Sequence, residues 1–334
     1  VFEECSKIET IELPDTITTI GHSAFSLCTS LVNITIPNEL QSLGPLAFNE
    51  CHSLVHFTIP YRITEISDSL FFECFSLVTV DIHDDITKIY PEAFHSCVKL
   101  QTITLPSNLV MIDEYAFVDC HSFTSITIPA SLEILQMGAF ANCIGVTQFT
   151  VATGNRHFRI INRALHSYNG TILYHYPLGS PETEYTPYAN TVILGDLSFS
   201  FSKLEKISFS NPSMEFGYGC FYNCSQLKYI ELPSELQFLQ YYTFAYCTSL
   251  ESISIPQTVV DVDKDTFYGC TSLTDVSYWG SFGPSCDVAF TECPNLTSIG
   301  VIDEYPDDTF CELPVHILPN NTATSTPSSQ TTPT

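Results

Sequence analysis

Apolar residues return to the same relative positions every 23 residues along most of the chain. Cysteine marks this period most clearly, and eleven cysteines keep it in two runs. The first run is Cys5, Cys28, Cys51, Cys74, Cys97, Cys120 and Cys143, and the second is Cys224, Cys247, Cys270 and Cys293. Phenylalanine stands three residues before each of these cysteines, and an apolar residue stands three residues after it. A phase held over so many periods indicates an internal repeat, which sets the architecture of the chain.

Each repeat contains a short stretch in which apolar and polar residues alternate, as in a β-strand. Ile34 and Ile36 flank Thr35, and Pro37 ends the stretch because proline has no N–H for a strand ladder. A unit of 23 residues is too short to bury its own apolar face, but stacked copies bury it against one another. The pattern therefore predicts a repeat solenoid in which successive strands stack in parallel.

The repeat can be written LxxIxIPxxLxxIxxxAFxxCxSL, as in the stretch from Leu31 to Leu54. This motif resembles the BspA-like class of leucine-rich repeat. The resemblance implies a leucine-rich-repeat horseshoe or curved rod with a parallel β-sheet and 23-residue coils. It also implies an extracellular, cell-surface location, because this class occurs on the surfaces of bacteria and parasitic protists, where its members act in adhesion.

One segment interrupts the repeat, because Cys143 and Cys224 are 81 residues apart, which is not a multiple of 23. Within it, apolar and polar residues alternate on both sides of Asn169-Gly170, a dipeptide typical of β-hairpin turns. We therefore expect N-terminal leucine-rich repeats at 1–151, an irregular insert with a β-hairpin at 152–200, and C-terminal repeats with a cap at 201–318. Residues 319–334 are rich in Ser, Thr and Pro, which predicts a stalk or linker.

The eleven periodic cysteines are expected to be buried thiols, because they share one apolar phase beside phenylalanine. A single file of this kind lacks the short spacings of a zinc site. Cys286 and Cys311 lie outside the phase, near the end of the array, and are the candidate pair for a disulfide. Such a bond would be consistent with an oxidising compartment.

The charge of the chain narrows the classes of partner. Eleven Lys and Arg stand against 37 Asp and Glu, a formal net charge of −26. An acidic surface repels nucleic acid and anionic lipid, so we expect neither as a partner. No apolar run has the length that spans a bilayer, so membrane attachment is expected only through a segment beyond the C-terminus. No phosphate loop, HExxH or GxSxG motif is present, so we expect no enzyme activity, no cofactor and no metal site.

Basic residues gather in the insert, where no Asp or Glu occurs between Ile134 and Pro181. This window suggests a site for an anionic glycan, since arginine offers a forked donor to such groups. The alternative is that its arginines pair with neighbouring carboxylates and fix the insert to the solenoid. His166 and His175 are expected to share one face of the hairpin. The candidate ligand-binding residues are Arg156, His157, Arg159, Arg163, His166 and His175.

A second candidate surface is formed by the outward positions of the predicted strands, which are small and rich in hydroxyl groups. Threonine favours strands in any case, but solenoids often bind proteins on a concave strand face. The sequence shows no large aromatic hot spot at these positions, so it does not identify the partner. The candidate concave-face residues are Thr35, His56, Thr58, Thr102, Thr104, Thr127 and Tyr229.

These features suggest a cell-surface, adhesin-like ectodomain that binds a host extracellular-matrix or cell-surface protein, or an anionic glycan. The alternatives are a structural spacer or coat protein without a specific ligand, and a receptor or scaffold for a self-encoded partner. Among the Asn-x-Ser/Thr triplets, Asn169 at the hairpin turn and Asn320 in the stalk are the glycosylation candidates.

Overall fold

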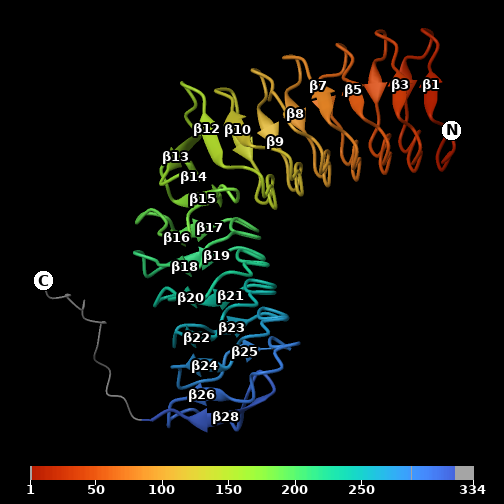
Figure 1. The fold of residues 1–334 in the computed structure, drawn as a ribbon. Coiled ribbons are helices and arrows are strands. Elements are labelled where there is room, and N and C mark those ends of the chain that lie inside the picture. Colours follow the sequence, from red (N-terminus) through yellow and green to blue (C-terminus); the bar gives the residue numbers. More distant parts are fainter. Residues whose placement is uncertain (1, 287, 320–334) are drawn as a thin grey trace, which may run out of the picture.

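The computed structural model describes residues 2–286 and 288–319, which form a parallel β-solenoid without helices (Figure 1). Each regular coil has a first strand, a second strand, and a turn segment that ends at the periodic cysteine. The solenoid fold with parallel strands is confirmed. No helix of the described residues is long and apolar enough to cross a bilayer.

The strands form two rows along the molecule. The first row consists of β1 (Thr10–Glu12), β3 (Asn33–Thr35), β5 (His56–Thr58), β7 (Thr79–Asp81), β10 (Ser125–Ile128), β12 (Gln148–Val151), β16 (Glu184–Tyr185), β18 (Lys206–Ile207), β20 (Tyr229–Ile230), β22 (Ser252–Ile255), β24 (Asp275–Tyr278) and β26 (Ile299–Val301). The second row consists of β2 (Thr19–Ile20), β4 (Ser42–Leu43), β6 (Glu65–Ile66), β8 (Lys88–Ile89), β9 (Met111–Ile112), β11 (Ile134–Leu135), β17 (Ile193–Leu194), β19 (Glu215–Phe216), β21 (Phe238–Leu239), β23 (Asp261–Val262) and β25 (Ser285–Cys286).

The register between coils reproduces the sequence period. Thr10 pairs with Asn33 in the first row, and Thr19 pairs with Ser42 in the second, so both rows advance by 23 residues. Each repeated residue therefore lies beside its copy in the next coil.

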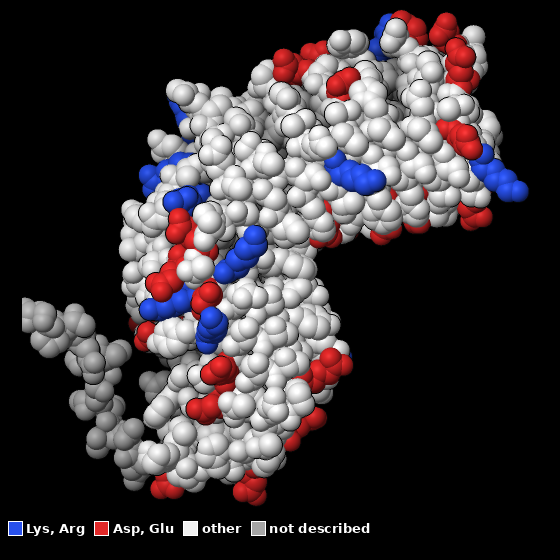
Figure 2. Space-filling model, in the orientation of Figure 1, with Lys and Arg blue, Asp and Glu red and all other residues white. Residues whose placement is uncertain are grey.

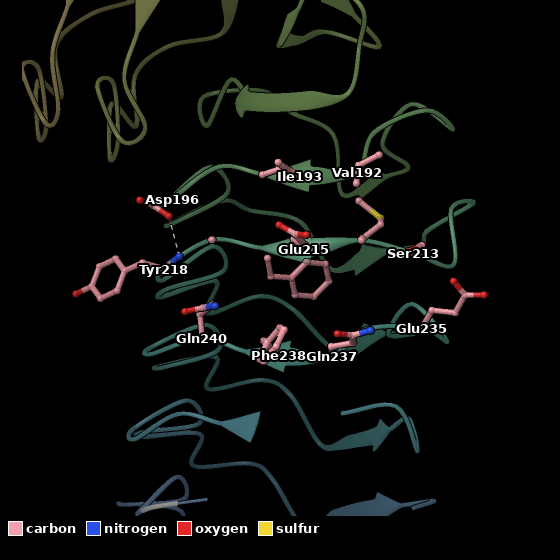
Figure 3. A pocket seen from close by; sticks show the side chains of 13 residues that line it. Val192, Ile193, Asp196, Ser213, Glu215, Tyr218, Glu235, Gln237, Phe238 and Gln240 are labelled. Carbon is pink, nitrogen blue, oxygen red and sulfur yellow. Dashed lines mark hydrogen bonds between the residues drawn. The ribbon is translucent and has the colours of Figure 1, made fainter. Parts of the chain in front are cut away.

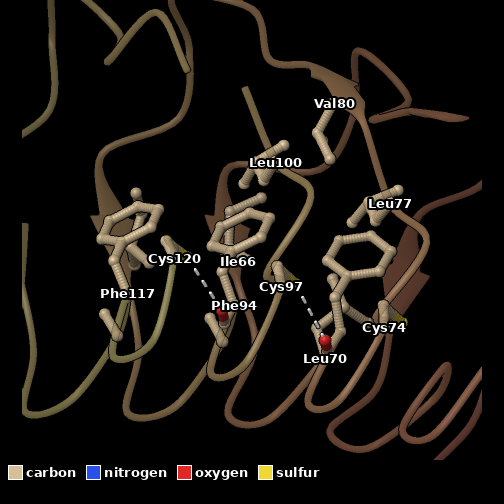
Figure 4. Packing of buried hydrophobic residues seen from close by; sticks show 14 of the residues in the cluster. Ile66, Leu70, Cys74, Leu77, Val80, Phe94, Cys97, Leu100, Phe117 and Cys120 are labelled. Atoms are coloured by element: carbon tan, nitrogen blue, oxygen red, sulfur yellow. Dashed lines mark hydrogen bonds between the residues drawn. The ribbon is translucent and has the colours of Figure 1, made fainter. Parts of the chain in front are cut away.

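The core is a stack of equivalent side chains (Figure 4). The ring centroids of Phe94 and Phe117 lie 5.1 Å apart, with the rings nearly parallel. The thiol of Cys120 donates a hydrogen bond to the backbone carbonyl of Phe94, 3.3 Å away. Burial raises the pKa of the Cys120 thiol well above its ordinary value, so the sulfur stays protonated and can donate this bond. Cysteine thus contributes an apolar side chain and a satisfied donor at the same position.

The insert contributes three antiparallel strands: β13 (Phe158–Ile161), β14 (Ala164–Ser167) and β15 (Ile172–His175). The turn between β14 and β15 includes Gly170, which has a φ of 80°, a conformation that favours glycine. β15 then pairs in parallel with β17, so the insert leads directly into the second row of strands.

The irregular part of the chain is shorter than the expected 152–200. β16 and β17 already pair in parallel with β18 and β19 of the following coil. In this coil Phe199 stacks on Phe221, and Ser202 occupies the cysteine position, where its hydroxyl lies 3.3 Å from the thiol of Cys224. The cysteine pattern does not include this coil, because serine replaces cysteine and the spacing from Ser202 to Cys224 is 22 residues.

The solenoid bends sharply at the insert (Figure 1). The turn segments on the two sides of the insert contact each other directly, since Asn142 and Ser200 are hydrogen bonded. The strands of the insert lie on the outer side of the bend, between the two arms of the solenoid. The array therefore bends toward its turn segments, and the turns line the inner side of the bend.

The last coils carry a disulfide between Cys286 and Cys311, whose Cα atoms lie 5.2 Å apart. Beyond them, β27 (Thr309–Phe310) and β28 (Leu313–Ile317) form an antiparallel pair, and β28 also pairs in parallel with β26. This arrangement covers the edge of the first strand row.

Candidate functional site

The predicted strand-face residues lie along one flank of the solenoid and are largely exposed. The ring of His56 contacts the hydroxyls of Thr79 and Thr58 at 2.7 and 3.2 Å, and Thr58 donates to Asp81. Thr127 and Thr150 are hydrogen bonded at 2.8 Å. Many of these polar groups therefore already bond one another across coils.

The expectation that this flank is concave is wrong. Thr35, Thr102 and Thr104 belong to the same flank, whereas the inner side of the bend is formed by turn segments (Figure 1). The direction of the bend depends on the insert, which the repeat pattern does not describe.

The same flank holds two aromatic residues: Tyr229, which the sequence pattern already placed there, and Trp279, which it did not. Tyr229 and Trp279 line one hollow of about 480 Å³, together with Glu231, Ser252 and Ser254. The indole N–H of Trp279 donates to the hydroxyl of Ser254 at 2.8 Å, which fixes the ring although 41% of the residue is exposed. The spacing of 25 residues between them falls outside the period of 23, so the sequence pattern gave no sign of this contact.

The arginines of the insert differ in their surroundings. Arg163 forms an ion pair with Glu182 at 2.9 Å, and Arg159 lies over the ring of Tyr168 at 5.8 Å. Arg156 is exposed and has no carboxylate within 4.0 Å among the described residues. Figure 2 shows blue and red side chains side by side on the outer side of the bend, so basic charge there is partly neutralised.

The structure does not bring the insert's histidines into one site. A register shift follows Leu165, so Leu165 pairs with His175 and His166 pairs with Leu173. The ring of His166 lies between the Ala164 carbonyl and the Thr191 hydroxyl, at 3.0 and 3.3 Å. His157 is exposed directly before β13.

His175 has a structural position instead. Its Nε2 accepts a hydrogen bond from the backbone N–H of Phe140 at 3.2 Å. In regular coils this N–H is bonded to a carbonyl of the next coil, as Phe117 is to Ala139. His175 therefore completes the last coil before the bend.

A groove crosses the second strand row of the C-terminal arm (Figure 3). Its volume is about 520 Å³, and apolar side chains, including Phe238 and Val192, lie beside the carboxylates of Asp196, Glu215 and Glu235. Asp196 accepts a hydrogen bond from the backbone N–H of Tyr218 at 2.9 Å, which places both residues at one end of the groove. No lysine, arginine or histidine belongs to its described lining.

Two further groups of polar residues lie near the surface. Glu50, His52 and Glu73 bring ligand atoms within 4.8 Å of one another, but all three are partly exposed. Asn169 is exposed at the hairpin turn, where its side-chain oxygen accepts a hydrogen bond from the hydroxyl of Thr171 at 2.8 Å. The other glycosylation candidate, Asn320, lies outside the described residues.

Comparison with known proteins places the repeat in a family. The model of the BspA type leucine rich repeat region matches residues 1–122, 64–164 and 192–310. No curated protein matches the sequence significantly.

Among solved structures, a leucine rich cell surface protein from Faecalibacterium prausnitzii A2-165 is similar, with 26% identity, a TM-score of 0.71 and 88% of each chain covered. The pneumococcal vaccine antigen PcpA shares the fold at 21% identity and a TM-score of 0.66, over 92% of this chain and 73% of that one. A leucine-rich repeat protein from Eubacterium ventriosum ATCC 27560 shares it at 21% identity and a TM-score of 0.63, over 93% and 78% of the two chains. With its repeat, coil geometry and family match in agreement, the chain belongs to the BspA-type leucine-rich repeat family.

Proposed function

We propose that this chain is the binding region of a cell-surface protein that adheres to a host extracellular-matrix or cell-surface protein. The observation that carries the proposal is the set of aromatic rings held at the surface by rigid coils, with Trp279 fixed by Ser254 beside Tyr229. Tyrosine and tryptophan are enriched where protein interfaces gain most of their binding energy. The description of the similar protein from F. prausnitzii as a cell-surface protein supports this location.

The test is binding of the purified chain to a panel of immobilised matrix proteins, measured by surface plasmon resonance. A variant with Tyr229→Ala and Trp279→Ala is expected to bind at least ~10-fold more weakly, as for loss of interface aromatics. Tyr61→Ala is a matched control, because Tyr61 is an exposed tyrosine of the N-terminal arm. Saturable binding that no surface variant weakens would contradict a role for these residues.

A second candidate is binding of an anionic glycan at the insert, which the exposed and unpaired guanidinium of Arg156 favours. A glycan array with sulfated and sialylated sugars, probed with the wild-type chain and with Arg156→Ser, Arg159→Ser, Arg163→Ser, tests it. Absence of binding to both panels would favour the structural spacer, or a receptor for a partner made by the same organism.

A further inference from the structure

Tyrosines gather on the turn segments of the C-terminal arm, on the inner side of the bend. They occupy positions one to six residues before a periodic cysteine, which the structure places on this side. We call these residues the tyrosine surface: Tyr218, Tyr222, Tyr241, Tyr242, Tyr246 and Tyr268. Tyr115 of the N-terminal arm lies near Tyr218 and Asp196 of the C-terminal arm.

The rings form a continuous surface across neighbouring coils. The ring centroids of Tyr218 and Tyr241 lie 6.0 Å apart, and those of Tyr241 and Tyr242 lie 4.0 Å apart. The series continues with Tyr222 to Tyr246 at 5.6 Å. Tyr246 to Tyr268, at 5.2 Å, extends it into the next coil. All of these residues are partly exposed, so the rings offer edges and faces to a partner.

Backbone conformation does not account for tyrosine at these positions. Tyr115, Tyr242 and Tyr246 have φ values of 55°, 58° and 60°, in the left-handed region that disfavours bulky side chains. Equivalent positions in other coils adopt the same conformation with residues such as Leu46, Glu92 and Gly269. The conformation therefore belongs to the repeat, and the aromatic ring is what distinguishes these coils.

Carboxylates surround the rings. Burial, followed by the negative charges of Asp196, Glu114 and Glu92, raises the pKa of Tyr115 to about 12. Asp196 belongs to the other arm, so carboxylates of both arms lie near Tyr115. A hydrogen bond with Glu292 raises the pKa of Tyr268 to about 12.

A hydrogen bond with Tyr241 raises the pKa of Tyr242, to which the charge of Asp265 adds and which the charge of Lys264 opposes. The acidic groove of Figure 3 joins the tyrosine surface, because Tyr218 belongs to both and its backbone N–H donates a hydrogen bond to Asp196 of the groove. Glu215 and Glu235 line the same groove. The combined surface thus offers aromatic faces and carboxylates together.

We propose that the tyrosine surface and the adjoining groove bind an extended, arginine- or lysine-rich segment of the partner protein. Guanidinium and ammonium groups stack on aromatic faces and pair with carboxylates, and this surface presents both at the spacing of successive coils. Binding of this kind rests on the proposed function, which it deepens by naming the site and the charge of the partner. The strand-face aromatics would then contact another part of the same partner.

The first test uses the full chain and a nine-residue peptide of alternating Arg and Gly, measured by isothermal calorimetry at physiological salt. The variant Tyr218→Ala, Tyr241→Ala leaves the charge unchanged and is expected to bind ~10-fold more weakly, as for loss of two cation–π contacts. The variant Glu215→Gln, Glu235→Gln is expected to weaken binding similarly. The control Glu9→Gln, Glu12→Gln removes two carboxylates from the distant end of the first strand row and is expected to change affinity by less than ~2-fold.

Three outcomes would overturn the proposal. These are no saturable binding of the peptide, equal loss in the control and groove variants, and unchanged affinity in the tyrosine variant. Thermal unfolding of each variant checks that the coils remain folded, and Tyr218→Phe, Tyr241→Phe keeps the ring faces and is expected to retain affinity. Running the tyrosine variant on the matrix panel separates the two proposals. If the wild-type chain and the variant bind a panel protein equally, this inference fails while adhesion stands, and if neither binds, adhesion itself fails.

Discussion

The thiol of Cys97 donates a hydrogen bond to the backbone carbonyl oxygen of Phe71, 3.2 Å away in the preceding coil. The same carbonyl accepts the N–H of Cys74 within its own coil. Cys51 and Cys74 bond the carbonyls of Phe25 and Phe48 in the same way. Cysteine therefore links adjacent coils through a side chain small enough to fit between the stacked rings.

Replacing Cys97 with alanine should destabilise the chain by ~1–2 kcal/mol, because it removes a buried hydrogen bond and leaves a small cavity. The measurement is the free energy of unfolding from urea denaturation followed by circular dichroism. Cys5→Ala is the control, because Cys5 is only partly buried, and it should cost less than ~0.5 kcal/mol. Equal losses in the two variants would show that the thiol bond contributes nothing.

His175 should make stability depend on pH. Burial lowers the pKa of its imidazole from 6.5 to about 3, whereas the unfolded chain binds the proton near the ordinary value. Its contribution to stability is therefore complete above pH 6.5 and declines as the pH falls toward 3.

The variant His175→Gln keeps an acceptor for the Phe140 N–H but cannot titrate. Between about pH 7.5 and about pH 5, wild type should lose ~2 kcal/mol more unfolding free energy than the variant. The exposed His22→Gln is the matched control and should follow wild type. Parallel pH profiles for wild type and His175→Gln would contradict a neutral, buried His175.

The disulfide should stabilise the last coils specifically. Changing Cys286 and Cys311 to serine opens a loop with a sequence separation of 25 and should cost ~3 kcal/mol by the chain-entropy estimate. Hydrogen exchange should rise in β25 to β28 and stay unchanged in β1 to β7, because coils contact only their neighbours. Exchange that rises evenly along the array would argue against a local effect.

The left-handed residue before each cysteine offers a test of backbone strain. Ser96 has a φ of 57°, which glycine adopts readily and a β-branched residue does not. Ser96→Gly should raise the free energy of unfolding by ~0.5–1 kcal/mol, and Ser96→Val should lower it by more than this amount. Calorimetry of both variants checks this, and a stabilising valine would be incompatible with the described turn.

The repeat made much of the fold predictable, because stacked copies place Phe94 on Phe117 wherever the period of 23 holds. Where the period fails, the local sequence pattern did not predict the coils or their contacts. Ser202 concealed a regular coil, and the contact between Trp279 and Ser254 follows no repeat spacing.

The candidate binding surfaces were harder to predict for a related reason. The sequence assigns Tyr218 and Tyr241 to turn segments but cannot tell that these turns face the N-terminal arm. The position of these turns relative to the N-terminal arm depends on the insert at the bend. It also depends on contacts such as the hydrogen bond between Asn142 and Ser200, which are 58 residues apart.

If the chain is made in an oxidising compartment, the single file of thiols makes folding and oxidation compete. Twelve cysteines are unpaired in the folded chain, and those from Cys28 onward are buried. Before folding, all of them are accessible to oxidants and to one another, and neighbouring copies are close enough in sequence to cross-link. Each coil that docks buries one thiol and protects it from oxidants. The yield of correctly bonded protein therefore depends on the rate of coil stacking relative to the rate of thiol oxidation.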